Sequence, residues 1–187
     1  MLRNDKLTKV ARCLIILLMV VLAGVGCTDN SKQPTAPTEK AVETQPGVKA
    51  DKMVVTLYFA TKDGAALVAE KREVSKSDQP VQTALEELIV GPRTAELVKV
   101  LPDTSKVRKI SIVDHVAYID FNDAFVKDHW GGSAGEILTI SAVVNTVTEF
   151  PEIRSVQFMT EGKRMDTLKG HLDLSEPMVR HNAIIRR

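Results

Sequence analysis

Cysteine is almost missing from this chain, and aromatic residues are few. Both cysteines, Cys13 and Cys27, lie near the start, so the sequence beyond them can form neither a disulfide nor a thiolate metal site. The four histidines stand at 115, 129, 171 and 181, and no two have a metal-ligand spacing such as H-x-x-x-H. We therefore expect a domain held together by its hydrophobic core, with no metal and no other cofactor.

The chain also lacks a basic patch. Residues 51–187 contain 18 Lys and Arg against 20 Asp and Glu, and no basic cluster is interleaved with aromatic residues. Proteins that bind nucleic acid usually concentrate Lys and Arg on one face or along one helix. The sequence therefore predicts no nucleic-acid partner.

One apolar run stands near the N-terminus. It extends from Cys13 to Gly26 behind a positively charged start, and it is shorter than the roughly 20 residues that a membrane span needs. Its length is typical of a signal peptide. The run ends in Leu22-Ala23-Gly24-Val25-Gly26 before Cys27, which resembles a bacterial lipobox. We expect residues 1–26 to be a lipoprotein signal peptide and Cys27 to carry lipid, such as palmitate; ordinary secretion or an uncleaved anchor are the alternatives.

A tether and one domain follow. Cys27 and the tether occupy residues 27–50, where three prolines and a low apolar content prevent a core from forming. The domain is expected at 51–177, and residues 178–187 are expected to be a frayed C-terminal tail.

The domain alternates strand and helix patterns. Apolar residues alternate in four predicted strands. Apolar residues at helical spacing predict a helix that starts at Pro80 and stops at Gly91-Pro92. A final hairpin is predicted with its turn at Glu161-Gly162. The four strands are predicted at 53–59, 66–74, 107–113 and 115–121. The order predicts an α+β fold, a two-layer α/β sandwich with a mostly antiparallel sheet and two helices on one face.

The second helix is predicted at 133–149. Its many Ile, Val and Thr residues favour a strand, but the segment is too long for one ordinary strand. Ser133 and Glu136 have the spacing of a capping box, in which Ser133 would be the N-cap.

Seven phrases together resemble the GerMN domain, also called the sporulation and spore germination domain. They are VTLYFATKDG (55–64), ALEELIVGP (84–92), LPDTSKV (101–107), VAYIDFNDAFV (116–126), GGSAGE (131–136), NTVTEFP (145–151) and GHLDLSEP (170–177). The resemblance covers about residues 53–177 and implies a spore-forming, Gram-positive source, a role in sporulation or germination, and a fold similar to ring-building domains. One departure is the turn Asp114-His115, where Asp-Gly is usual, so we expect a tighter or altered turn there.

Several residues have side chains suited to catalysis. Ser133, His171 and Asp173 are the residue types of a nucleophilic triad, but the G-x-S-x-G elbow is missing. Glu136 with Glu149 or Asp173 could form a carboxylate pair for cell-wall cleavage, and nothing in the sequence selects one pair. We expect no enzymatic activity.

A further possibility is an anion site at the glycine-rich entry to the second helix. Gly131 and Gly132 expose backbone N–H groups at a helix N-terminus, where an anion could bind. Glu136 already supplies a carboxylate there, which favours a structural role for this entry.

Two aromatic residues are candidates for an interaction surface. Trp130 is the single tryptophan and lies in a predicted loop, where it either binds a partner or folds back on the core. Tyr58 shares the outer face of the first strand with Val54 and Thr56, which predicts an exposed apolar patch. The alternative is that the second strand, or the tail with its Ile184-Ile185, covers this patch.

The leading hypothesis is a non-enzymatic lipoprotein on the extracytoplasmic face of the cell membrane. Its partners would be the membrane, through the lipid, and an envelope protein or peptidoglycan, with self-association as a further possibility. The alternatives are an enzyme that acts on peptidoglycan and a lipoprotein that binds a small ligand. The candidate interaction residues are Tyr58, Trp130, Ser133, Glu136, His171 and Asp173.

Overall fold

The computed structural model describes residues 51–187, and the predicted signal peptide, Cys27 and tether lie outside the described residues. In chain order the elements are β1 (Lys52–Thr61), β2 (Leu67–Ser75), α1 (Pro80–Val90), β3 (Leu97–Val98), β4 (Val107–Val113), β5 (Val116–Phe121), α2 (Ala124–Lys127), α3 (Ser133–Val147), β6 (Ser155–Thr160), β7 (Lys163–Arg164), β8 (Met178–Val179) and a 3-10 turn at Asn182–Ile184. No helix within residues 51–187 has both the length and the apolar character that a membrane span requires.

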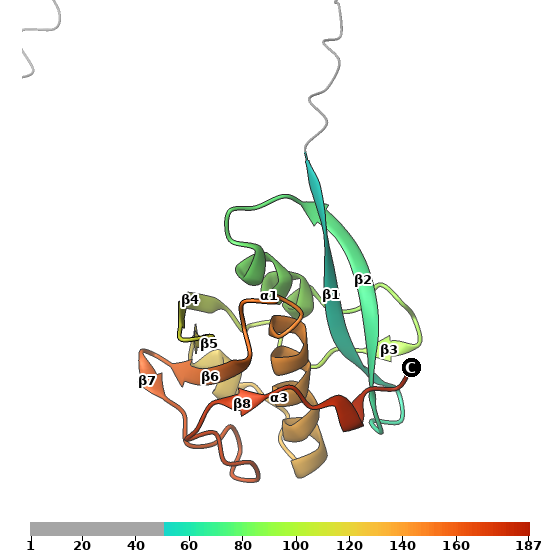
Figure 1. Cartoon of the computed structure of the whole chain (residues 1–187). Helices are drawn as coiled ribbons and strands as arrows, with labels where there is room; N and C mark the ends of the chain where they lie inside the picture. The colour runs from blue at the N-terminus through green and yellow to red at the C-terminus, as the bar shows by residue number, and fades with distance from the viewer. Residues whose placement is uncertain (1–50) are drawn as a thin grey trace, which may run out of the picture. The chain divides into compact units, whose positions relative to one another are not determined.

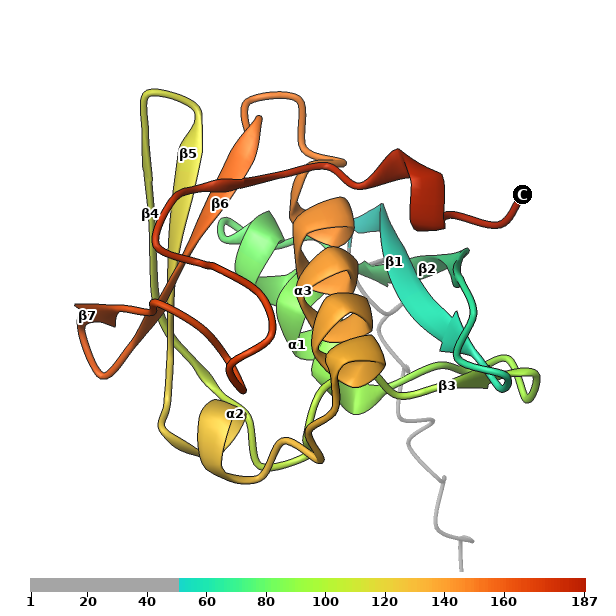
Figure 2. The ribbon, with the colours of Figure 1, turned by 90° about the horizontal axis from the view of Figure 1, so that it is seen from below.

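Two sheets enclose the helices. The first has the strand order β2-β1-β3, and the second has the order β4-β5-β6-β7, with β8 also pairing with β6. Only the β5–β6 pair is parallel, among the strand pairs of the described residues. In Figures 1 and 2, α1 and α3 lie between the two sheets. The predicted α+β class and mostly antiparallel pairing are confirmed, but the predicted single sheet is divided into two, each with the helices on one face.

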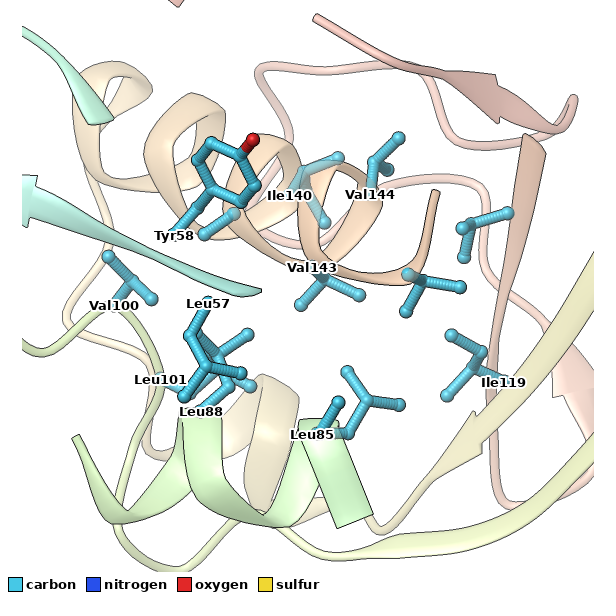
Figure 3. Close-up of a cluster of buried hydrophobic side chains, with 14 of the residues drawn as sticks. Leu57, Tyr58, Leu85, Leu88, Val100, Leu101, Ile119, Ile140, Val143 and Val144 are labelled. Atoms are coloured by element: carbon cyan, nitrogen blue, oxygen red, sulfur yellow. The ribbon is translucent and has the colours of Figure 1, made fainter. Parts of the chain in front are cut away.

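Helix α1 follows the sequence pattern closely. It begins with a proline in its first turn and ends at Gly91, whose φ of 100° is a conformation that favours glycine. Its buried side chains form one stripe, Val81, Ala84, Leu85 and Leu88. Figure 3 shows Leu85 and Leu88 pointing from α1 toward Leu57 of β1 and Val143 of α3. This stripe therefore joins both helices and the first sheet in one hydrophobic core.

The start of α3 differs from the prediction. The N-cap is Gly132, with φ of 81°, and Ser133 is already the first helical residue, with no capping bond from a side chain. The capping box is therefore wrong. Its physical reason is that Gly131 and Gly132 both adopt left-handed backbone conformations, which bring the chain into the helix without a capping serine.

The β4–β5 turn keeps its two-residue form without glycine. Asp114 and His115 have φ values of 49° and 65°, as a type I′ turn requires. The ring of His115 bonds to the carbonyl oxygen of Glu152 over 2.9 Å, and the His115 carbonyl accepts a bond of 2.8 Å from the amide of Arg154. These two contacts hold His115 in a conformation that costs a non-glycine residue energy, so the predicted alteration of the turn is not seen.

The C-terminal residues are ordered, so the prediction of a frayed tail is wrong. Strand β8 pairs with β6, Ile185 forms a parallel bridge with Leu67, and the Arg186 amide donates to the Leu67 carbonyl over 2.8 Å. Pairing with both sheets fixes this segment across the domain, as Figure 2 shows.

The tail also covers Tyr58. This side chain is 4% exposed, and its hydroxyl donates to Glu149 over 2.7 Å and accepts from Arg180, whose guanidinium lies 5.1 Å from the ring centroid. The expected exposed patch is therefore wrong at Tyr58, and the alternative of a covering tail is what the structure shows. Val54, nearer the start of β1, is exposed.

We predict that Arg180→Ala destabilises the domain. Arg180 bonds to Tyr58, Glu149 and the carbonyl of Asn145, so truncation removes three hydrogen bonds and the guanidinium that pairs with Glu149, at a cost of about 1–3 kcal/mol. Denaturant unfolding measures this loss. Arg187→Ala changes an exposed arginine and should be neutral, and equal stability of the two variants would show that the tail does not hold the domain.

Candidate interaction site

A buried histidine fixes the loop before α3. His129 is 4% exposed, and its Nε2 lies 2.9 Å from the hydroxyl of Thr139. That hydroxyl donates its proton to the carbonyl of Val100 over 2.6 Å, so the His129 Nε2–H must be the donor to Thr139. The Nδ1 atom accepts from the amide of Gly131 over 3.0 Å. Burial, together with the charge of Lys169, lowers the pKa of His129, which is consistent with a neutral ring that has one fixed tautomer.

Trp130 is held on this histidine and faces solvent. Its ring stacks on His129 with centroids 4.9 Å apart, and 56% of the residue is exposed. A Cβ atom on Gly135 would lie 3.0 Å from the indole Nε1, so glycine at 135 allows the indole to lie close over the first turn of α3. The sequence left open whether Trp130 folds back or stays exposed; the structure shows a fixed ring with an accessible surface.

A groove of about 760 Å³ lies beside Trp130. Its walls come from the β1–β2 turn, the segment after β3 and the start of α3, and they include Lys62, Val98, Leu101, Thr104 and Leu138. Thr104 donates to the carboxylate of Asp128 over 2.5 Å at this groove. Apolar walls with a few polar groups are typical of binding sites.

Glu136 holds the loop that follows β7. The carboxylate is fully buried and accepts bonds from the Thr167 hydroxyl (3.0 Å), the amides of Leu168 (3.1 Å), His171 (3.0 Å) and Leu172 (3.3 Å), and His171 Nδ1 (3.0 Å). Burial by itself would raise the pKa of Glu136, but these donors outweigh it and lower the pKa to about 2. The residue is therefore a charged anchor between α3 and this loop.

The predicted catalytic residues are not brought together as a triad. His171 bonds to Glu136, whereas Asp173 accepts from the amide (2.9 Å) and the hydroxyl (2.6 Å) of Ser175. Within residues 51–187 no hydrogen bond joins Ser133 to His171 or Asp173. Among the predicted catalytic residues in the described part of the chain, the one hydrogen-bonded pair is Glu136 and His171.

The roles of His129 and Gly135 were not predicted from the sequence. The signal for Gly135 was available, because a glycine inside a helix costs stability and calls for a packing reason. The sequence gave no signal for His129, because its partner Thr139 lies in another element and is fixed in turn by the carbonyl of Val100, 39 residues earlier than Thr139.

The family model for sporulation and spore germination, Germane, matches residues 56–166, which is more than half of the chain. No curated protein matches the chain.

Solved structures share its fold. The tandem GerMN domains of the sporulation protein GerM from Bacillus subtilis match with 21% identity over 69% of this chain and 46% of that chain, at a TM-score of 0.61. The first GerMN domain of that protein matches with 24% identity over 68% of this chain and 98% of that domain, at a TM-score of 0.60. A candidate lipoprotein from Clostridium perfringens matches with 24% identity over 68% and 87%, at a TM-score of 0.50. This chain thus spans about half of the tandem structure and nearly all of its first domain.

We predict that Glu136→Gln destabilises the domain in a pH-dependent way. The amide places a donor among backbone donors and should cost about 1–3 kcal/mol at neutral pH. Because folding lowers the pKa of Glu136 from 4.5 to about 2, its stabilisation is complete above pH 4.5 and is lost as the pH falls toward 2. The unfolding free energies of the wild type and of Glu136→Gln should therefore converge as the pH falls from 4.5 toward 2.

The matched control is Glu176→Gln, which changes an exposed carboxylate. Its unfolding free energy should follow that of the wild type at every pH. A difference between wild type and Glu136→Gln that stays constant from pH 7 to pH 2 would contradict the role of the buried charge.

Proposed function

Since this chain belongs to the Germane family of sporulation and spore germination domains, we propose that it is a lipid-anchored, extracytoplasmic binding protein of a spore-forming Gram-positive bacterium. Its role in sporulation or germination is to bind a protein of the cell envelope without catalysing a reaction. The observation that carries this proposal is the exposed Trp130, held on His129 beside a groove of about 760 Å³.

The Trp130 groove has the properties of a protein contact. Tryptophan is enriched among the residues that contribute most to binding, and a ring fixed before binding loses little entropy when a partner arrives. The stacking on His129 and the close approach to Gly135 supply this fixation. Val98, 39% exposed, adds apolar surface to the same groove.

The carboxylates that suggested cell-wall cleavage have structural partners. Glu136 is surrounded by donors from the 167–172 loop, and Glu149 bonds to Tyr58 and Arg180. A carboxylate that holds several bonds in the resting fold is poorly placed to exchange protons with a substrate. These contacts support a binding role over an enzymatic one.

The lipid anchor is supported by the leader sequence. Cys27 directly follows an apolar run of signal-peptide length. The Clostridium perfringens protein that shares the fold is itself a candidate lipoprotein.

The groove is tested by affinity capture from sporulating cells. Wild-type protein should retain an envelope protein that Trp130→Ala loses, while both proteins unfold at the same denaturant concentration because the indole is largely exposed. Val90→Ala, which truncates an exposed side chain on α1, is the matched control and should retain the partner. Equal capture by Trp130→Ala, or a lytic band from the wild type in a cell-wall zymogram, would contradict the proposal.

The anchor is tested by Cys27→Ala. This variant should remain as the unprocessed precursor or leave the membrane fraction, because the thiol that accepts lipid is missing. Gel mobility, metabolic labelling with palmitate and membrane fractionation measure the change. Cys13→Ala lies inside the expected signal peptide and should be processed normally; Cys27→Ala that fractionates like the wild type would rule out the anchor.

A further inference from the structure

Strand β4 has an unpaired outer edge. It ends the strand order of the second sheet, and among residues 51–187 it pairs only with β5. Figure 2 shows β4 at the margin of the sheet, on the side of β5 away from β6. Ile112 is 43% exposed and Val113 is 53% exposed. A strand edge of this kind is a template for another strand.

The other strand edges are less suited to pairing. The start of β2 is covered by the C-terminal segment, through the Leu67–Ile185 bridge, and the following stretch, 70–73, consists of charged residues. Charged edges resist pairing. Strands β3, β7 and β8 have two residues each. β4 therefore offers the longest apolar edge in the described part of the chain.

The β4–β5 turn determines which backbone groups of β4 are free. Val113 and Val116 flank the two-residue turn, so they exchange hydrogen bonds with each other, and Ser111 and Tyr118 form the next such pair. Ile110 and Ile112 lie between these pairs and direct their N–H and C=O groups to the open edge. A second strand would bond to these two residues.

The groove beside this edge has both apolar and polar walls, and the polar ones include Asp78, Arg108 and Glu152. Ile110 and Ile112 line a cavity of about 520 Å³ together with Pro80 and Val81 at the start of α1. A strand added to the edge of β4 would place alternate side chains on this same face. Ile110 and Ile112 therefore offer two aliphatic side chains on this face to the alternate residues of an added strand.

We propose that β4 pairs antiparallel with β4 of a second copy of this chain, about a twofold axis at Ser111. In this register Ile110 bonds to Ile112 of the second copy, and Lys109 lies opposite its Val113. Basic residues lie just before and near the start of the strand, Lys106 and Lys109, and acidic residues lie just beyond its end, Asp114 and the adjacent Glu152. Antiparallel pairing brings opposite charges together, whereas parallel pairing would bring like charges together.

This pairing is separate from the proposed function. It needs neither the lipid on Cys27 nor the Trp130 groove. It buries a small area, so the two copies associate weakly in dilute solution, and covalent trapping is the suitable measurement.

Residues 51–187 contain no cysteine, so one introduced thiol reports on the pairing. In the full chain with Cys13→Ser and Cys27→Ser, purified in detergent, Ser111→Cys places two thiols across the twofold axis. This position is a non-hydrogen-bonded pair, where Cα atoms lie about 4.5 Å apart, within the range of a disulfide. Mild oxidation should yield a disulfide dimer about tenfold faster than for Lys71→Cys, an exposed position on β2, because pairing raises the effective concentration.

The register has its own control. Val113→Cys alone should dimerise slowly, since it faces Lys109 of the second copy, whereas a mixture of Lys109→Cys and Val113→Cys proteins should form the mixed dimer. Equal rates for Ser111→Cys, Val113→Cys and Lys71→Cys would overturn the proposal, because random collision would then explain every dimer.

A final variant blocks the edge. Ile112→Pro removes an N–H that the β4–β5 ladder does not use, and proline is tolerated on edge strands, so the domain should stay folded while Ser111→Cys loses its rapid dimerisation. If Ile112→Pro unfolds by circular dichroism, Ile112→Lys supplies the same test through charge. Unchanged dimerisation in a folded Ile112 variant would also overturn the pairing.

Discussion

The burial of α3 between two sheets is the constraint on which the rest of the domain depends. Eleven of its 15 residues are buried, and five of these carry polar side chains. A buried polar group costs free energy unless it forms hydrogen bonds. Each of these side chains therefore bonds to a residue outside the helix: Glu136 to the 167–172 loop, Thr139 to Val100 and His129, Ser141 and Asn145 to His181, and Thr146 to the amide of Tyr58.

These bonds explain how one helix positions segments that have little regular structure. The loop after β7 has its backbone amides directed at a single carboxylate, so it is ordered without strand pairing of its own. Thr139 fixes His129, and His129 in turn supports the indole of Trp130. The proposed contact surface is thus connected to the buried helix through Thr139 and His129.

Local sequence patterns predicted the helices and strands, whereas long-range contacts account for the features that these patterns missed. The apolar stripe of α1 and the β4–β5 hairpin follow from periodicity and turn position, which act over a few residues. Tyr58 is covered by Arg180, a residue 122 positions later, and no strand alternation can reveal such a partner. The spacing of Ser133 and Glu136 predicts a cap, yet two left-handed glycines start the helix, and the 167–172 loop binds the carboxylate. The site was predictable in part. Trp130 is a candidate because it is the single tryptophan, but no sequence pattern predicts that His129 supports its ring.

Glu136 and His171 show why residue types alone do not define chemistry. A carboxylate has about four lone-pair sites, and five donors surround Glu136, so its acceptor capacity is filled by the fold.

The surfaces left for partners are those where such internal bonds are few. The Trp130 groove is built from the β1–β2 turn, the segment after β3 and α3, whereas the β4 groove is built from β4 and the start of α1, and the two share no lining residue. The envelope protein and the second copy would therefore contact different residues of the domain.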